Sequence, residues 1–364
     1  MSQTLRQQVE TALQEYQDPL LGTSLGAARV LREIELDAQD RVRAKIVLGF
    51  PARSHGPVLA EALRSRLQGI PGVREAQIEV SARIVPHQAL QGVKRLGAVR
   101  NIIAVASGKG GVGKSTVAAN LALALAAEGA RVGMLDADIY GPSQPRMLGV
   151  RGRPDSVDGK RFKPMRSHTV QSMSVGYLID EDTPMVWRGP MVTQALQQLL
   201  NDTDWQDLDY LIVDMPPGTG DIQLTLSQHV PVSGAVIVTT PQDIATLDAR
   251  KGLQMFRKVN VPVMGIIENM ALHICSGCGQ EDAIFGSGGG ERIAADYHVP
   301  LLGRLPLDRR IREDADGGTP TVLADPDGPI AARFREIALR MAAKLSLQAE
   351  DFSGKFPQIV VVND

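Results

Sequence analysis

The chain has 364 residues, 43% of them hydrophobic and 22% charged, and a formal net charge of −2. This is the composition of a globular protein with one large domain or two unequal ones, and the small net charge argues against nucleic acid or an anionic membrane as a partner. Two cysteines exclude a disulfide-rich secreted scaffold, and the lack of a signal pattern or of a run of ~18 apolar residues leads us to expect a cytoplasmic protein.

The first 85 residues predict a small α/β domain. Apolar residues at helical spacing run from Leu5 to Tyr16, and Pro19 ends this helix. Residues 41–50 alternate between apolar and mostly charged side chains, as in a half-buried strand, with DAQD as the hairpin turn before it. A second helix and a last strand follow. The predicted order is α-β-β-α-β for residues 1–85, and residues 86–100 are expected to be a linker.

The pattern changes at Asn101, where short apolar runs alternate with longer helical patterns. Runs that are apolar on both faces belong to strands covered by helices on both sides. We therefore predict an α/β fold for residues 101–364, with a doubly wound, mostly parallel sheet. Residues 151–185 are irregular, so an ordered insertion and a mobile loop both remain open, and the role of PQIVVV (357–362) is unassigned. The predicted strands are residues 102–107, 131–136, 210–214, 235–240 and 262–268.

The stretch IIAVASGKGGVGKST contains the pattern G-x-x-x-x-G-K-[S/T], formed by Gly108, Gly113, Lys114 and Ser115. Glycines let several backbone N–H groups converge on one phosphate, and the N-terminus of the following helix adds partial positive charge. Lys114 is expected to reach the β- and γ-phosphates, and the Ser115 hydroxyl to bind Mg²⁺. The strand before the loop and the helix after it favour a P-loop over a glycine-rich turn without a ligand.

A second lysine, Lys109, lies inside this loop, where a P-loop does not require one. Because Lys114 already serves the distal phosphate of the same nucleotide, one interpretation is that Lys109 reaches the nucleotide of a second subunit. The residues alone leave a solvated surface lysine equally open.

A P-loop enzyme also needs a carboxylate near Mg²⁺ and a group that orients the attacking water. In YLIVDMPPGTGD, Asp214 ends a buried strand that we expect next to the P-loop strand. In MLDADIYGPS, Asp136 and Asp138 stand at the end of another strand, and one of them is a candidate to position or deprotonate water. The alternative for Asp138 is a cap for the segment that follows.

Taken in order, these motifs resemble the Mrp/ApbC family of P-loop iron–sulfur carrier ATPases. The resemblance covers about residues 98–345 and includes GKGGVGKS, DADIYGPSQPRMLG, WRGPM, LIVDMPPGTGD, TTPQDIATLDARKG, IENM, and C-x-x-C-G followed by IFGSGGGER. Residues 1–85 resemble the small iron–sulfur-assembly-associated domain often fused ahead of these ATPases. With Ser54 and His55 in its loop and no cysteine before Cys275, that domain is expected to dock partners or apo-acceptors rather than to bind a cluster through thiols.

The resemblance also implies roles for individual residues. Lys109 resembles the signature lysine of the deviant Walker A class, which acts across a nucleotide-sandwich dimer, and Asp138 resembles the switch I aspartate that activates water. Asp214 resembles the Walker B aspartate near Mg²⁺, and Asn269 of IENM resembles the asparagine that reads the adenine edge. Catalytic roles are thus expected for Lys109, Lys114 and Asp138, Mg²⁺ binding for Ser115 and Asp214, and ATP contacts for Gly108, Lys109, Gly110, Gly111, Val112, Gly113, Lys114, Ser115, Thr116 and Asn269.

Both cysteines lie in ICSGCG, as Cys275 and Cys278. The resemblance implies that this pair and the same pair of a partner subunit bridge a [4Fe–4S] cluster. Such a cluster usually takes four thiolates, which two symmetric chains supply. A zinc site with the same four thiolates, a thioredoxin-like redox pair and two unliganded thiols remain open from spacing alone.

We therefore expect a homodimeric ATPase that binds ATP and Mg²⁺ and carries a labile [4Fe–4S] cluster to apo iron–sulfur proteins, with cluster-assembly scaffold proteins as further partners. Neither nucleic acid nor a membrane is expected as a partner. The alternatives are a dimeric ATP-driven regulatory or positioning switch, which predicts a membrane-binding tail or a basic face, and a carrier of another metal such as zinc.

Overall fold

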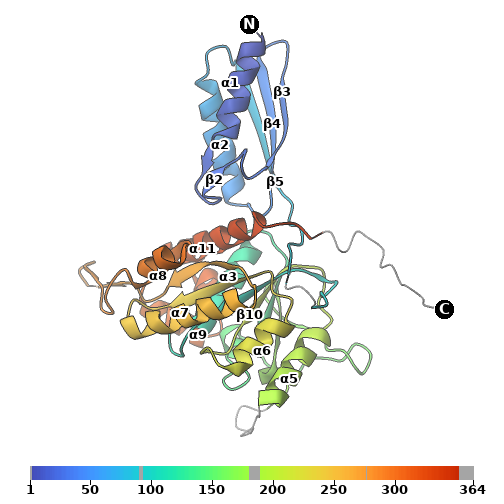
Figure 1. Cartoon of the computed structure of the whole chain (residues 1–364), viewed down its shortest axis with the longest axis vertical. Helices are drawn as coiled ribbons and strands as arrows, with labels where there is room; N and C mark the ends of the chain where they lie inside the picture. Colours follow the sequence, from blue (N-terminus) through green and yellow to red (C-terminus); the bar gives the residue numbers. More distant parts are fainter. Residues whose placement is uncertain (1, 90–92, 180–188, 276, 352–364) are drawn as a thin grey trace, which may run out of the picture.

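The computed structural model describes residues 2–89, 93–179, 189–275 and 277–351 (Figure 1). The N-terminal part is a three-stranded sheet, in the order β3-β4-β5, packed against two helices. Strands β3 and β4 are antiparallel and joined by the predicted DAQD turn, whereas β4 and β5 are parallel. The elements are α1 (Ser2–Gln14), β3 (Leu31–Leu36), β4 (Arg41–Leu48), α2 (His55–Gln68) and β5 (Glu75–Ala82).

The order α-β-β-α-β agrees with the sequence prediction, and the burial pattern gives the reason. In β4, Val42, Ala44, Ile46 and Leu48 are buried, while the charged residues between them lie on the other face. Strict alternation places one set of side chains on each face of a strand, so one face of this sheet is apolar and covered by helices. The sequence did not predict a short antiparallel pair after α1, formed by β1 (Gln17–Asp18) and β2 (Thr23–Ser24).

The larger part is built on an eight-stranded sheet in the order β15-β12-β11-β6-β10-β7-β9-β8. All neighbouring strands are parallel except β8 and β9, which confirms the predicted α/β fold with a mostly parallel sheet. The strands are β6 (Val99–Ala106), β7 (Val132–Asp136), β8 (Met165–Ser167), β9 (Val170–Ser174), β10 (Leu208–Asp214), β11 (Gly234–Thr239), β12 (Val263–Glu268) and β15 (Leu301–Arg304).

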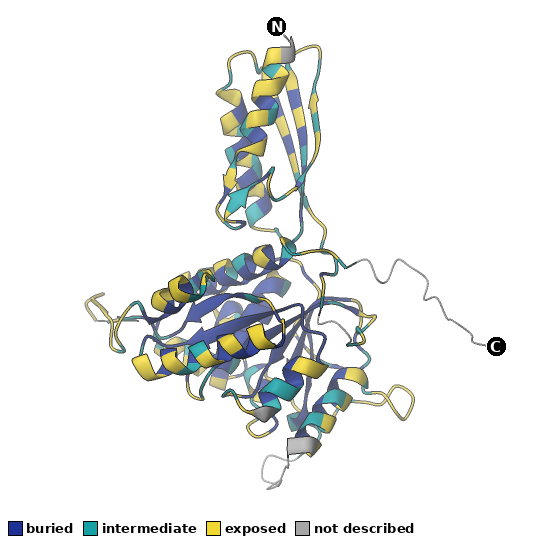
Figure 2. Cartoon of the chain, viewed as in Figure 1, coloured by how far each residue is buried: buried dark blue, intermediate teal, exposed yellow. Residues whose placement is uncertain are grey.

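Helices cover both faces of this sheet, and the central strands are therefore buried throughout (Figures 1 and 2). Along β6, Ile103 and Val105 belong to the core under α3 and α11, whereas Ile102, Ala104 and Ala106 belong to the core under α5 to α8. Double-sided burial explains why these strands read as continuous apolar runs. The helices are α3 (Lys114–Ala127), α4 (Gln144–Met147), α5 (Gly189–Asn201), α6 (Asp221–His229), α7 (Asp243–Lys258), α8 (Gly289–Tyr297), α9 (Arg309–Asp316), α10 (Thr321–Ala324) and α11 (Pro329–Ser346), with a 3₁₀ turn η1 (Val175–Tyr177).

The predicted strands of the eight-stranded sheet all exist, but some differ in extent, and three strands of this sheet were missed. Strand β6 begins at Val99, ahead of the predicted start. Strands β8, β9 and β15 were not predicted, and the first two lie within the irregular region 151–185, so that part of it is ordered. Residues 180–185 and the PQIVVV segment lie outside the described residues.

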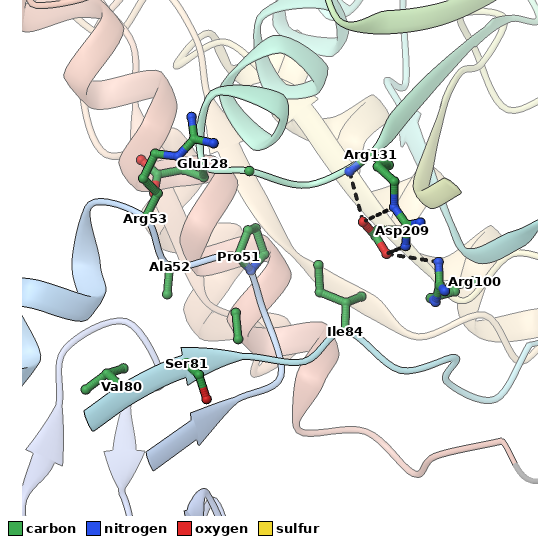
Figure 3. A pocket seen from close by; sticks show the side chains of 12 residues that line it. Pro51, Ala52, Arg53, Val80, Ser81, Ile84, Arg100, Glu128, Arg131 and Asp209 are labelled. Atoms are coloured by element: carbon green, nitrogen blue, oxygen red, sulfur yellow. Dashed lines mark hydrogen bonds and ion pairs between the residues drawn. The ribbon is translucent and has the colours of Figure 1, made fainter. Parts of the chain in front are cut away.

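The N-terminal part contacts the end of α3, the helix that begins at the glycine-rich loop. The Arg53 guanidinium donates to the Ala127 carbonyl, and the Ser54 N–H donates to the Glu128 carboxylate, each over 2.8 Å. A cavity of about 490 Å³ lies at this junction (Figure 3). Its wall on the larger part includes Arg100, Arg131 and Asp209 at the beginnings of the central strands, where both arginines donate to the Asp209 carboxylate.

The expected linker is held by the C-terminal end of the described chain. His87 pairs with Glu350 in an antiparallel bridge, the Asp351 N–H donates to the Pro86 carbonyl over 2.9 Å, and Arg95 pairs with Asp351 over 2.8 Å. These contacts fix residues 86–88 against the segment that follows α11.

Candidate functional site

The glycine-rich loop connects β6 to α3 at the carboxyl end of the central parallel strands. Gly111 and Gly113 have φ of +82° and +80°, a conformation that favours glycine, and Gly113 is the residue before α3. Gly108 passes close to α7, since a Cβ there would lie 2.1 Å from the Asp248 carbonyl carbon. The Ser107 hydroxyl donates to the Lys109 carbonyl over 2.9 Å. The strand–loop–helix arrangement that the motif requires is therefore present.

Lys114 lies beneath this loop, beside a buried carboxylate. Its ammonium group contacts Asp214 Oδ1 and donates to the Ser115 hydroxyl over 3.1 Å. Asp214 is fully buried, and its strand β10 is hydrogen-bonded to β6, as the sequence predicted. The second oxygen, Asp214 Oδ2, accepts from Gln144 Nε2 over 2.8 Å, and the same Gln144 group also donates to the Ser115 carbonyl over 3.0 Å. Gln144 thus links the P-loop helix, the strand-end aspartate and α4.

Asp136 stands directly opposite Asp214 in the register of β7 and β10. It is fully buried, and its Oδ2 accepts from the Ser143 and Gln144 N–H groups at 3.0 Å and from the Ser174 hydroxyl at 3.1 Å. Burial, and then the charge of Asp214, raise the pKa of Asp136 to about 7. Two buried carboxylates therefore share one buried lysine. A divalent cation would neutralise the remaining negative charge, and carboxylate oxygens are suitable ligands for it.

Asp138 follows at the mouth of the same strand and is half-buried. Burial is the main cause that raises the pKa of its carboxyl group, Lys114 opposes this, and Asp214 adds to it. Its carbonyl oxygen accepts from the Gly141 N–H over 3.3 Å, which forms a tight turn after the strand. A carboxylate with a raised pKa at an accessible strand end has the properties of a general base.

Two further predicted site residues are Lys109, inside the loop, and Asn269, beside it. Lys109 is half-buried and has no side-chain hydrogen bond or ion pair with any residue that the structure describes. Asn269 follows β12 and donates from Nδ2 to the Val112 carbonyl over 2.9 Å. It also lies against Gly113, where a Cβ would come within 2.3 Å of Nδ2. The structure therefore brings Asn269 to the P-loop and gives its amide a partner in the loop backbone.

The two cysteines lie on a short hairpin that projects from the carboxyl end of the sheet. Its strands are β13 (His273–Ile274) and β14 (Glu281–Asp282), and the Cys275 N–H donates to the Gln280 carbonyl over 2.9 Å. Cys278 is exposed, and Cys275 is partly exposed. The backbone N–H of Cys278 and then that of Gly277 donate to the Cys275 sulfur and hold the pKa of this thiol below its usual value. Such a thiol is readier to ionise and to bind a soft metal.

The base of the hairpin is attached to the segment before α9. The Leu307 N–H donates to the Leu272 carbonyl over 2.8 Å, and His273 Nδ1 pairs with the Leu307 carbonyl over 3.0 Å. Among the described residues, no group of three or more His, Cys, Asp or Glu side chains is arranged to hold a metal ion.

The structure adds Gln144 and Ser174 to the residues predicted for the nucleotide site. Gln144 lies in the DADIYGPSQPRMLG motif, but no local sequence pattern indicates that its side-chain amide donates to Asp214, 70 residues away in the chain. Ser174 ends β9, a strand that the sequence did not predict. Both residues were missed because their partners come together only in the folded sheet.

Comparison with known proteins identifies both parts. The family described as NUBPL iron-transfer P-loop NTPase matches residues 98–342, and the family described as iron-sulfur cluster assembly protein matches residues 6–80. An iron-sulfur cluster carrier protein of Salmonella typhimurium is 50% identical over 353 residues, covering 97% of this chain and 95% of that protein. The iron-sulfur cluster transfer protein NUBPL of Mus musculus is 46% identical over 280 residues, covering 76% of this chain and 86% of that protein.

Solved structures agree on the fold. A nucleotide-binding protein from Archaeoglobus fulgidus in complex with ADP aligns with a TM-score of 0.57 and 35% identity, over 65% of this chain and 93% of that one. The cell division ATPase MinD of Pyrococcus furiosus aligns with a TM-score of 0.50 and 24% identity, over 66% of this chain and 97% of that one, and supports the fold alone.

No helix within the described ranges is long and apolar enough to cross a membrane. The glycine-rich loop, the buried lysine beneath it and the family matches all point to one assignment: this chain belongs to the NUBPL iron-transfer P-loop NTPases, a family of ATPases, and carries an iron–sulfur cluster assembly domain ahead of the ATPase part.

Proposed function

We propose that this protein hydrolyses ATP and carries a [4Fe–4S] cluster between two subunits for transfer to apo-proteins. ATP would bind with its phosphates in residues 108–116, because the loop glycines and the N-terminus of α3 form an anion cradle. Lys114 would turn from Asp214 to the distal phosphates, and Ser115 and Asp214 would hold Mg²⁺, whose charge neutralises the phosphates. The excess of buried carboxylates beside Lys114 supports a cation at this place.

Asp138 is proposed to accept a proton from the water that attacks the γ-phosphorus, while ADP leaves. Its raised pKa and its place at the mouth of β7 support this role. Gln144 and Ser174 would position the neighbouring Asp136 and Asp214 rather than touch the reacting atoms. Asn269 is proposed to contact the adenine edge, in addition to its hydrogen bond with the P-loop.

Lys109 is proposed to act on the nucleotide of a second subunit. The support is that Lys114 already occupies the phosphate side of its own loop, and that Lys109 has no partner within the described part of its own chain. An unpaired cation beside a nucleotide site is available for charge-assisted bonds across a dimer interface.

The observation that carries the cluster proposal is the cysteine hairpin. It offers two accessible thiols, one with a lowered pKa, and this chain has no others. A cluster that takes four thiolates would then be shared by two hairpins around a two-fold axis. Ligands held on an exposed hairpin at a subunit boundary suit a cargo that must be released.

Hydrolysis would control this release. We propose that ATP draws the two subunits together through Lys109, and that loss of the γ-phosphate rearranges the loops after Asp138 and Asp214. In this scheme residues 1–85 form a domain that docks apo-acceptors or scaffold proteins, residues 86–100 link it to residues 101–364, and the protein works in the cytoplasm.

The test is anaerobic reconstitution with iron and sulfide, followed by iron, sulfide and zinc quantification, visible absorption and measurement of the oligomeric state. We expect about four iron and four sulfide per dimer in the wild type, and loss of both in Cys275→Ala and in Cys278→Ala. Gln280→Ala, in the same loop with both thiols intact, is the matched control. A full cluster retained by either cysteine variant, or zinc in place of iron in the wild type, contradicts the proposal.

A further inference from the structure

A second large cavity, of about 790 Å³, lies on the larger part, beside α4. Its volume is within the range of pockets that bind ligands, roughly 300–1,000 Å³. Three segments form its walls: the end of α4 with the loop after it, the turn η1, and the end of α9. Backbones of two of these segments meet at its corner, since a Cβ on Gly149 would lie 2.7 Å from the Gly318 carbonyl oxygen.

The lining of this cavity is basic, although the chain as a whole has a net charge of −2. Arg146, Arg151 and Arg153 line it, and Asp316 is the one acidic residue among those that do. Gly152 has a φ of +96°, and this left-handed turn lets the arginines on either side of it line the same cavity. Neither Arg146 nor Arg151 has an ion pair or side-chain hydrogen bond with a described residue, and these two guanidinium groups are the ones that we assign to a ligand below.

Two walls of the cavity are attached to the nucleotide site. Asp136 accepts from the Gln144 N–H at the start of α4 and from the Ser174 hydroxyl just before η1. Ser174 in turn accepts from the Gly176 N–H in the cavity wall over 3.0 Å. The wall formed by α4 and the wall formed by η1 are therefore held by the same buried carboxylate, which stands opposite Asp214.

The third wall leads to the cysteine hairpin. Helix α9 has eight residues and spans about 12 Å, at 1.5 Å per residue. Its first residue follows Leu307 and Asp308, where the hairpin base is attached, and its last residue, Asp316, lines the cavity. A protein segment held in the cavity would thus lie one short helix away from the base of the hairpin.

From this placement we propose that the cavity is a docking site for an acidic segment of a partner protein, and that partners receiving the cargo of the hairpin bind there. Guanidinium groups form bidentate, charge-assisted bonds with carboxylates, and Val150, Tyr177 and Ile179 add apolar surface for the side chains between them. The identity of the partner as a cargo acceptor rests on the proposed function; the acidic docking site does not.

A segment of peptide fits this lining better than a compact phosphate. The cavity includes the carboxylate of Asp316 and the C-terminal end of α9, where helix carbonyls carry partial negative charge. A phosphate in the centre would meet this repulsion. An extended peptide can place its carboxylates at the arginines and its uncharged residues beside Asp316.

The test uses the full-length protein and a fluorescein-labelled octapeptide of alternating glutamate and valine, with fluorescence anisotropy as the readout. We expect the Arg146→Ala/Arg151→Ala variant to bind this peptide at least tenfold more weakly than the wild type, because two charge-assisted contacts are lost. Arg32→Ala/Lys258→Ala removes the same charge from exposed positions outside the cavity and should bind as the wild type does. Arg146→Lys/Arg151→Lys keeps the charge and should bind with intermediate affinity.

Three results overturn the docking site: no binding of the peptide, equal binding by wild type and Arg146→Ala/Arg151→Ala, or equally tight binding of the same peptide with glutamine in place of glutamate. Displacement of the peptide by inorganic phosphate at lower concentration than by glutarate would assign the cavity to phosphate and also overturn the docking site.

With a cluster-loaded protein, Arg146→Ala/Arg151→Ala should keep ATP hydrolysis and cluster content while transfer of the cluster to an apo-acceptor slows. If the wild type binds the peptide but holds no cluster after reconstitution, the docking site stands, and only the proposed iron–sulfur cargo is contradicted.

Discussion

The buried carboxylate of Asp136 makes the stability of the nucleotide-free protein depend on pH in an unusual direction. Acidic groups in folded proteins commonly have lowered pKa values, and their contribution to stability is lost in acid. Asp136 has its pKa raised from 3.8 to about 7, because it is fully buried and stands opposite Asp214. The folded state therefore binds a proton more tightly than the unfolded chain, and the carboxyl group destabilises the fold as pH rises toward 7.

The magnitude follows from these two pKa values. A rise from 3.8 to about 7 corresponds to a penalty of roughly 4 kcal/mol once the group is ionised in both states, at about 1.4 kcal/mol per pKa unit. Integrated between pH 5 and pH 8, the loss of unfolding free energy is roughly 2–3 kcal/mol. The stabilising protonation is fully present below the unfolded pKa and disappears as pH rises through the folded pKa.

Asp136→Asn removes this titration and keeps the shape of the side chain. Its amide oxygen can still accept from Ser143, Gln144 and Ser174, while the NH₂ group faces the Asp138 N–H, which costs about 1 kcal/mol at any pH. The variant should therefore gain stability relative to the wild type as pH rises from 5 to 8, by the 2–3 kcal/mol estimated for the wild-type penalty.

The assay is urea unfolding followed by tryptophan fluorescence, with metal chelator and no nucleotide. Of the two tryptophans, Trp205 is buried in the larger part, and Trp187 lies outside the described residues. Because titrating groups away from this pair are common to the two proteins, the difference between them reports on the coupled pair Asp136 and Asp214. A difference in unfolding free energy that is the same at pH 5 and pH 8 would refute the reasoning.

Three further predictions concern the loop and its supports. Gly108→Ala places a Cβ 2.1 Å from the Asp248 carbonyl carbon and should weaken ATP binding at least tenfold in calorimetry, whereas Gly97→Ala, outside the loop and with no neighbour within 4 Å, should not; equal affinities would contradict the close approach. Lys109→Ala should leave the melting temperature unchanged and slow phosphate release from ATP at least tenfold; an unchanged rate argues against a role across subunits. Gln144→Leu leaves a buried carboxylate oxygen without its donor and should lower the unfolding free energy by about 1–3 kcal/mol; urea unfolding with no loss would show that this hydrogen bond is dispensable.

The central strands were predictable because a strand that is buried on both faces appears in the sequence as a nearly continuous run of apolar residues. Strand β10 reads LDYLIVD, and all seven of its residues are buried. Strand β9 is equally buried, yet its sequence is VQSMS. Gln171 is satisfied by Gln206, and Ser172 by Tyr177, so polar side chains are tolerated there. A sequence shows that such a residue is polar, but not that it will find a hydrogen-bond partner inside the fold. Strand β9 was missed for this reason.

The same limit applies to the candidate site. The motifs located Lys114, Asp138, Asp214 and the cysteines because each has a local signature. Gln144 has none: its role depends on Asp214, which reaches it only when β10 and β7 lie side by side. Local chemistry can be predicted from a sequence, whereas the hydrogen bonds that hold it in place depend on topology.

The arrangement of Asn269 bears on how the two sites communicate. Its side chain holds the P-loop at Val112, its backbone N–H donates to Thr239, and the chain then reaches the cysteine hairpin within four residues. The Ala271 N–H also donates to the Leu305 carbonyl, so the middle of this short connection is held by the residue that follows β15. A displacement of the P-loop that broke the Val112 contact would free the side chain of Asn269 but leave its backbone and Ala271 fixed. We therefore expect only small shifts of the hairpin base through this path, and we expect larger movements of the cysteines to involve α9, where His273 and Leu307 join the two segments.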